Sequence, residues 1–161
     1  RGQIVIPLSA AEPPDELNLT RSLRHEYTHA LVHALSAGRC PGWIDEGLAQ
    51  WSEGEENPAL QPALRGWLRH DPPVSFGLLQ GGFTRLQNQM VPAAYAQSLF
   101  ATNTLIRTYG FNSLREYFDE LRYGSEPSVA FRTAFNQSER NYEGRLGRIL
   151  LAWRDDTFSD N

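Results

Sequence analysis

The sequence predicts an α+β fold that is strongly α-rich. Apolar residues recur at a spacing of three and four positions through much of the 161-residue chain, as they do on one face of a helix. Proline and glycine stand at the ends of several of these stretches, where they typically begin and end helices. One segment near the N-terminus instead carries the β-branched residues that strands favour. We therefore expect one strand followed by a series of helices.

The expected strand covers residues 3–8, QIVIPL. Pro7 cannot donate a hydrogen bond to a neighbouring strand, so the segment is typical of the edge of a sheet. After a polar loop, Thr20 is a suitable N-cap for a helix that runs to about Ser36, with Gly38 just past its end. One face of this helix is apolar and is formed by Leu23, Tyr27, Ala30, Leu31, Ala34 and Leu35.

The rest of the chain is expected to be helical, with one long loop region. Proline and glycine are frequent after residue 70, which predicts loops that could wall a cleft. We expect the acidic tail, residues 155–161, to fray. Further helices are expected over residues 44–53, 62–70, 92–110, 113–122, 127–135 and 138–154.

Length and composition indicate a single domain over residues 1–161. The net charge is −4 and no basic cluster occurs, which argues against nucleic acid as a partner. No apolar run approaches the roughly 20 residues of a membrane-spanning helix. Cys40 is the single cysteine, so no internal disulfide can form. Because the chain begins at Arg1 rather than at methionine, we expect it to be a piece of a longer protein, and its compartment stays open.

The segment HEYTH, residues 25–29, carries the pattern HExxH. Residues four positions apart lie on one face of a helix, so His25 and His29 can converge on one Zn²⁺ ion. Glu26 then lies beside the metal and can accept a proton from a metal-bound water molecule. In a chain of this composition the pattern arises by chance about once in a hundred sequences. A third ligand would make the zinc site much more secure.

A second segment, WIDEGLA, supplies a candidate for that ligand. Glu46 opens the next expected helix, 17 positions after His29, which is enough chain to reverse direction. Together HEYTH and WIDEGLA resemble the gluzincin metallopeptidases, and the short distance between them is similar to that in small peptidase MA-like domains. The resemblance implies a zincin-like domain: an edge strand, an active-site helix and a C-terminal helical bundle. It also implies one zinc ion held by His25, His29 and Glu46, with a peptide or protein as substrate.

Two other residues compete for the position of third ligand. His33 continues the spacing of four, but it lies about 12 Å along the helix from His25, too far to share one ion. Asp45 points about 100° away from Glu46, and a carboxylate in the first turn of a helix is favoured by the helix dipole alone. Glu46 is therefore the expected ligand.

Other residues are candidates for supporting roles. Gln50 and Glu53 lie one and two turns beyond Glu46 and could orient the histidines. Peptide hydrolysis also needs a hydrogen-bond donor for the developing oxyanion. Tyr95 is the first candidate, because YAQSL resembles a segment on a downstream helix of the same family, and His70 is the alternative.

The expected edge strand could bind the substrate backbone as an added strand. We therefore predict a zinc peptidase that acts through a metal-activated water molecule with Glu26 as general base. The alternative is a catalytically silent module of the same fold, in which the metal stabilises a peptide- or protein-binding surface.

Overall fold

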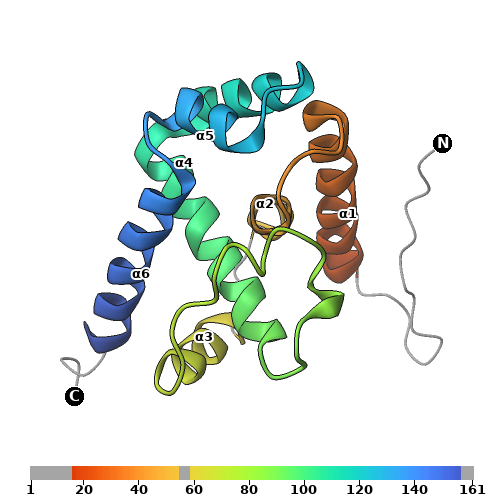
Figure 1. The fold of residues 1–161 in the computed structure, drawn as a ribbon. Coiled ribbons are helices and arrows are strands. Elements are labelled where there is room, and N and C mark those ends of the chain that lie inside the picture. The colour runs from red at the N-terminus through yellow and green to blue at the C-terminus, as the bar shows by residue number, and fades with distance from the viewer. Residues whose placement is uncertain (1–15, 55–58, 157–161) are drawn as a thin grey trace.

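The structure is a computed structural model, and it describes residues 16–54 and 59–156 of the chain. This part folds into six α-helices and one short 3₁₀ helix (Figure 1). None of the described helices is both long and apolar enough to cross a membrane. The elements are α1 (Glu16–Ser36), α2 (Gly42–Ser52), α3 (Leu60–Leu68), η1 (Phe83–Arg85), α4 (Val91–Arg122), α5 (Pro127–Phe135) and α6 (Glu139–Asp155).

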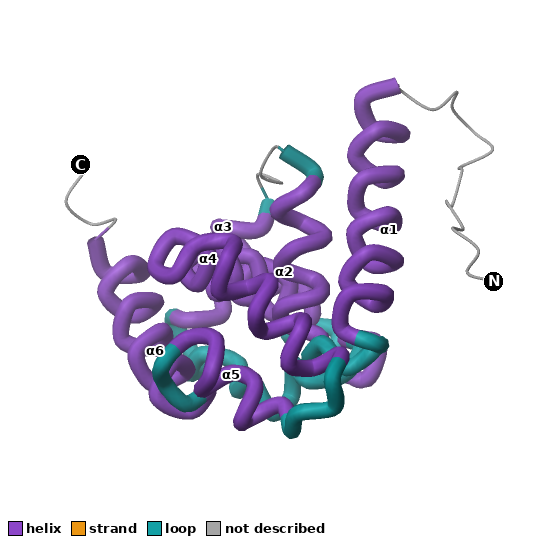
Figure 2. The backbone as a smooth tube through the Cα atoms, turned by 90° about the horizontal axis from the view of Figure 1, so that it is seen from above, coloured by secondary structure: helices purple, strands orange, loops and turns teal. Residues whose placement is uncertain are grey.

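The predicted α+β class is wrong for this part of the chain. Residues 16–54 and 59–156 contain helices and loops but no strand (Figure 2). The edge strand predicted over residues 3–8 lies outside the described residues, as does the end of the predicted tail. A strand needs a hydrogen-bonded neighbour, and the described residues offer none. Their apolar side chains are instead buried where helices pack against one another.

The helix boundaries follow the proline, glycine and capping signals closely. The predicted helix over residues 127–135 matches α5, and Ser138 caps α6 by accepting a hydrogen bond from the Asn141 backbone N–H at 3.1 Å. Gly110 separates the two halves of α4, because its φ of 78° and ψ of 172° are not helical. Thr20 is not an N-cap, since α1 begins at Glu16 and the Thr20 hydroxyl donates to the Glu16 carbonyl oxygen one turn back.

Helix α2 lies at the centre of the molecule, between α1 on one side and α4 on the other (Figure 1). Its Trp43 is fully buried and stacks on Phe76 with ring centroids 4.2 Å apart. The Trp43 indole N–H donates to the Glu139 carboxylate on α6 at 2.9 Å. Tyr142, also on α6, lies 6.0 Å from Trp43 between ring centroids. These contacts attach the start of α2 to the C-terminal half of the fold.

Further along α2, Gly47 lets the helix come very close to α4. A Cβ atom at this position would lie 2.1 Å from the Thr102 hydroxyl oxygen and 2.5 Å from the Ser98 carbonyl oxygen. Both distances are far below van der Waals contact, so a side chain here would force the two helices apart. The close crossing of α2 and α4 therefore depends on Gly47 having no side chain.

Gly47→Ala should destabilise the protein by about 2–3 kcal/mol, because overpacking a close helix crossing displaces backbone. Chemical denaturation followed by circular dichroism measures this change. The matched control is Gly144→Ala in α6, where a Cβ atom would meet nothing within 4 Å. That control should be neutral or stabilising by up to about 1 kcal/mol. Equal stability of the two variants would contradict the proposed crossing.

Candidate metal centre

Helix α1 presents two imidazole rings side by side, one turn apart. The Nε2 atoms of His25 and His29 are 3.1 Å apart, and the ring centroids are 4.8 Å apart. Both rings are partly buried. The two nitrogen atoms therefore face the same small volume, as the HExxH spacing predicts.

Helix α2 brings a carboxylate to the same volume. Glu46 Oε2 lies 3.9 Å from His25 Nε2 and 3.8 Å from His29 Nε2. This oxygen is buried and has no hydrogen-bond partner among the described residues. We call His25, His29 and Glu46 the metal cluster, because their ligand atoms lie within 4.8 Å of one another.

Each imidazole is hydrogen-bonded through its Nδ1 atom to a carboxylate. Glu53 Oε1 lies 2.8 Å from His25 Nδ1, and Asp45 Oδ1 lies 2.9 Å from His29 Nδ1. An ionised carboxylate only accepts hydrogen bonds, so each Nδ1 carries the proton and donates it. In a neutral imidazole the Nε2 atom then has a free lone pair.

The metal cluster thus directs three lone pairs at one point. With neutral histidines, no proton lies between these three atoms to offset the repulsion of their lone pairs. A bound cation would offset it. Ligands about 2.0–2.1 Å from a tetrahedral zinc ion lie roughly 3.3–3.4 Å apart, close to the separations of 3.1–3.9 Å found here. The cluster therefore fits a small divalent metal with an open fourth position.

The two pKa shifts in the metal cluster have local causes. The hydrogen bond that His29 donates to Asp45 raises the pKa of His29, and the charges of Asp45, Glu46 and Glu26 add to this against the opposing effect of burial. Burial raises the pKa of the Glu46 carboxyl, and the two histidines oppose that shift. A proton and a metal ion therefore compete for the same atoms.

Arg21 binds the carboxylate of Glu53, which in turn binds His25. Its Nη2 atom donates to Glu53 Oε2 at 2.8 Å, while the other oxygen of Glu53 accepts from His25. The arginine is one turn before His25 on α1, so it anchors Glu53 from the same helix. The imidazole, the carboxylate and the guanidinium form one chain of charge-assisted hydrogen bonds.

Two further residues lie close to the metal cluster. Glu26 is near enough for its charge to raise the pKa of both His29 and Glu46. Tyr95 on α4 packs edge-on against Phe83, with ring centroids 5.0 Å apart. Burial and the charge of Glu46 raise the pKa of the Tyr95 phenol, so it keeps its proton and can donate a hydrogen bond.

Three residues considered from the sequence lie elsewhere. The Gln50 amide donates to the backbone carbonyl oxygens of Tyr95 and Glu46, at 2.9 and 3.2 Å, rather than to a histidine. His33 is exposed in the last turn of α1, outside the metal cluster. His70 is exposed after α3, whose end is bound to α6 by a hydrogen bond from Arg154 to the Leu68 carbonyl oxygen.

Asp45 is the residue whose contact the sequence did not reveal. Its position in the first turn of α2 is explained by the helix dipole, and its place next to Glu46 suggested that it points away. Its carboxylate accepts a hydrogen bond from His29 Nδ1, the ring nitrogen that does not face Glu46. The one available signal was that both histidines would need an acceptor behind Nδ1.

Comparison with known proteins bears on this geometry. A family model described as the Peptidase MA superfamily matches residues 10–145, which is most of the chain. Searches of curated proteins and of solved structures gave no significant match. The matched range includes both helices that form the metal cluster.

Asp45→Asn should weaken the binding of added Zn²⁺ by about 10- to 100-fold, because the amide is a weaker partner for His29 Nδ1–H. Competition with a chromophoric chelator measures the affinity. Asp119→Asn, an exposed position on α4, is the matched control and should bind zinc like the wild type.

The pH dependence separates this role from a structural one. Zinc binding requires unprotonated His29, whose pKa is raised by its hydrogen bond to Asp45, so the zinc affinity should begin to fall at a higher pH than for an ordinary histidine. Asp45→Asn removes the largest cause of the shift, so its zinc affinity, although weaker at neutral pH, should begin to fall from its plateau at a lower pH. An unchanged pH profile would contradict the assigned contact.

Proposed function

The chain belongs to the Peptidase MA superfamily, and on that premise we propose that it is a zinc-dependent peptidase of the gluzincin type. The observation that carries the proposal is the convergence of His25 Nε2, His29 Nε2 and an otherwise unpartnered Glu46 oxygen. Two nitrogen donors and one carboxylate oxygen, with a fourth position open, are the donor set of a catalytic zinc site. The substrate would be a peptide or a protein.

When bound, zinc supplies two kinds of chemistry: it lowers the pKa of a water molecule to about 7 and polarises the carbonyl group under attack. The side chains of the chain supply the remaining functions. Asp45 and Glu53 hold the two imidazoles in the tautomer that leaves Nε2 free. Arg21 in turn holds Glu53.

Glu26 is the proposed general base. It follows His25 on α1 and its charge acts on His29 and Glu46, so it lies beside the metal cluster without belonging to it. It would accept a proton from the attacking water molecule and deliver it to the leaving amine. A purely structural metal site has no need of such a base.

Tyr95 is the proposed donor to the oxyanion that forms on the substrate carbonyl. Its phenol keeps its proton at neutral pH, since burial and the charge of Glu46 raise its pKa. Phe83 packs against its ring, and Gln50 binds its backbone carbonyl oxygen at 2.9 Å. Both contacts restrict the position of the tyrosine, which a preorganised donor requires.

Glu26→Gln should keep zinc and lower kcat by about 10²- to 10⁴-fold, because the amide cannot accept the proton. Metal analysis and cleavage of a peptide library measure the two properties. Glu116→Gln, an exposed position on α4, is the control and should retain full activity. Full activity of Glu26→Gln would disprove the mechanism. Zinc binding by the wild type without turnover of any peptide would instead favour the catalytically silent module.

Tyr95→Phe should lower kcat by about 10²- to 10³-fold, with zinc content and KM nearly unchanged, because the hydroxyl is needed only in the transition state. Steady-state kinetics on the best library peptide measure this separation. His70→Asn tests the alternative donor and should leave kcat unchanged, since His70 is exposed at the end of α3. The reverse pattern would assign the donor to His70.

A further inference from the structure

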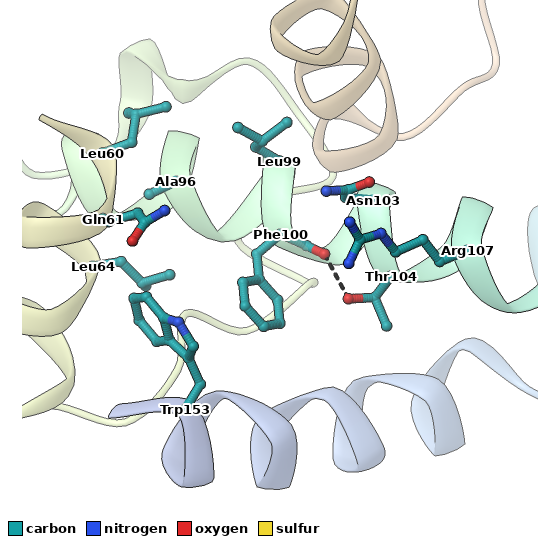
Figure 3. A pocket seen from close by; sticks show the side chains of 10 residues that line it. All are labelled: Leu60, Gln61, Leu64, Ala96, Leu99, Phe100, Asn103, Thr104, Arg107 and Trp153. Atoms are coloured by element: carbon teal, nitrogen blue, oxygen red, sulfur yellow. Dashed lines mark hydrogen bonds between the residues drawn. The ribbon is translucent and has the colours of Figure 1, made fainter. Parts of the chain in front are cut away.

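A cavity of about 320 Å³ lies between α3, α4 and α6 (Figure 3). It shares no residue with the metal cluster or with the side chains that support it. Its volume is at the lower end of the range for small-molecule sites, which suits one short chain rather than a folded segment. The lining residues are Leu60, Gln61, Leu64, Ala96, Leu99, Phe100, Asn103, Thr104, Arg107 and Trp153.

The inner part of the cavity is apolar. Leu64, Ala96 and Leu99 are buried and form its base. The rings of Phe100 and Trp153 lie 5.7 Å apart between centroids and form a wall between α4 and α6. These surfaces can take an aliphatic or aromatic group, and their one hydrogen-bonding group is the indole N–H of Trp153.

Three of the four polar lining residues, Asn103, Thr104 and Arg107, lie along α4, and the fourth, Gln61, is on α3. The Thr104 hydroxyl already donates to the Phe100 carbonyl oxygen at 2.8 Å. Figure 3 shows the guanidinium of Arg107 turned back along α4 toward Asn103 and Thr104. Arg107 is exposed and pairs with no acidic residue among those described. An amide and a guanidinium are thus available on α4.

The one charged residue that lines the cavity, Arg107, is positive, although the chain has a net charge of −4. None of the ten lining residues is acidic. A second arginine, Arg65, lies with its guanidinium carbon 4.2 Å above the Trp153 ring. A ligand with a negative group at one end would therefore meet complementary charge.

We infer that this cavity binds an apolar chain that ends in a carboxylate. The apolar part would lie against Leu64, Leu99 and Trp153, and the carboxylate would bind Arg107 and Asn103. A medium-chain fatty acid and a peptide with an apolar C-terminal residue both carry this chemistry. The site is separate from the proposed peptidase function and does not depend on a metal.

Isothermal titration calorimetry tests the inference with two pairs of ligands. Decanoate is compared with decanol, and an N-acetylated dipeptide ending in leucine is compared with its C-terminal amide. At least one carboxylate should bind about fivefold more tightly than its neutral partner at low salt, and this preference should shrink at high salt. The carboxylate that binds more tightly identifies the ligand as a fatty acid or as a peptide C-terminus.

Two substitutions on α4 test where the carboxylate binds. Arg107→Gln should remove the preference for the carboxylate and leave the neutral ligand unaffected. Arg115→Gln, also exposed on α4 and with the same change in net charge, should behave like the wild type. Both changes are at exposed positions, so folding should be retained. A carboxylate held at the metal cluster would not respond to Arg107→Gln.

Three results would overturn the inference. One is that neither carboxylate binds, and another is that each binds no better than its neutral partner. The third is an equal loss of affinity in Arg107→Gln and Arg115→Gln, which would indicate a general effect of net charge.

Discussion

The close crossing of α2 and α4 at Gly47 is the constraint on which the metal cluster depends. Gly47 touches Ser98 and Thr102, and the Thr102 hydroxyl donates to the Trp43 carbonyl oxygen at 3.3 Å. Because α2 is rigid, this contact and the buried Trp43 together set the position of every other residue on it. The carboxylates of Asp45 and Glu46 thereby reach α1 at the height of the two histidines. The cluster is thus built by packing on the side of α2 that is remote from it.

The charges around the histidines need compensation. Four carboxylates, those of Glu26, Asp45, Glu46 and Glu53, gather around two imidazoles, while Arg21 is paired with Glu53. Partly buried like charges repel one another more strongly than in water. Protonation of His29 and Glu46 relieves some of this repulsion, which adds to the larger effects on their pKa values of the hydrogen bond to Asp45 and of burial, respectively. A divalent cation would relieve it without protonating the ligands.

The two histidines also mark the face of α1 that is turned toward α2. The side that carries His25 and His29 packs toward α2, so the apolar residues on the other side are exposed. Leu23, Tyr27 and Leu31 are 43%, 61% and 44% exposed, although they form a regular helical stripe. Apolar periodicity alone would have buried this stripe.

Most helix boundaries could be predicted from the sequence, because caps, prolines and glycines act within a few residues of one another. The HExxH spacing likewise brings His25 and His29 together within a single helix. The grouping of Glu46 with them was also predicted, from its separation of 17 positions from His29 and from the resemblance of WIDEGLA to the gluzincin peptidases. The absence of strands from the described residues was not predicted, because one β-branched segment cannot reveal whether it has a neighbouring strand.

The sequence by itself therefore determined the helices and the three residues of the metal cluster. Only the tertiary structure decided that Asp45 contacts His29, that Gln50 binds the backbone of α4, and that a cavity opens beside Trp153. The reason is that spacing along the chain specifies what one helix presents on each face. The partner that each face meets depends on how the helices cross, and that crossing arises from contacts such as Gly47 with Thr102, more than 50 residues apart.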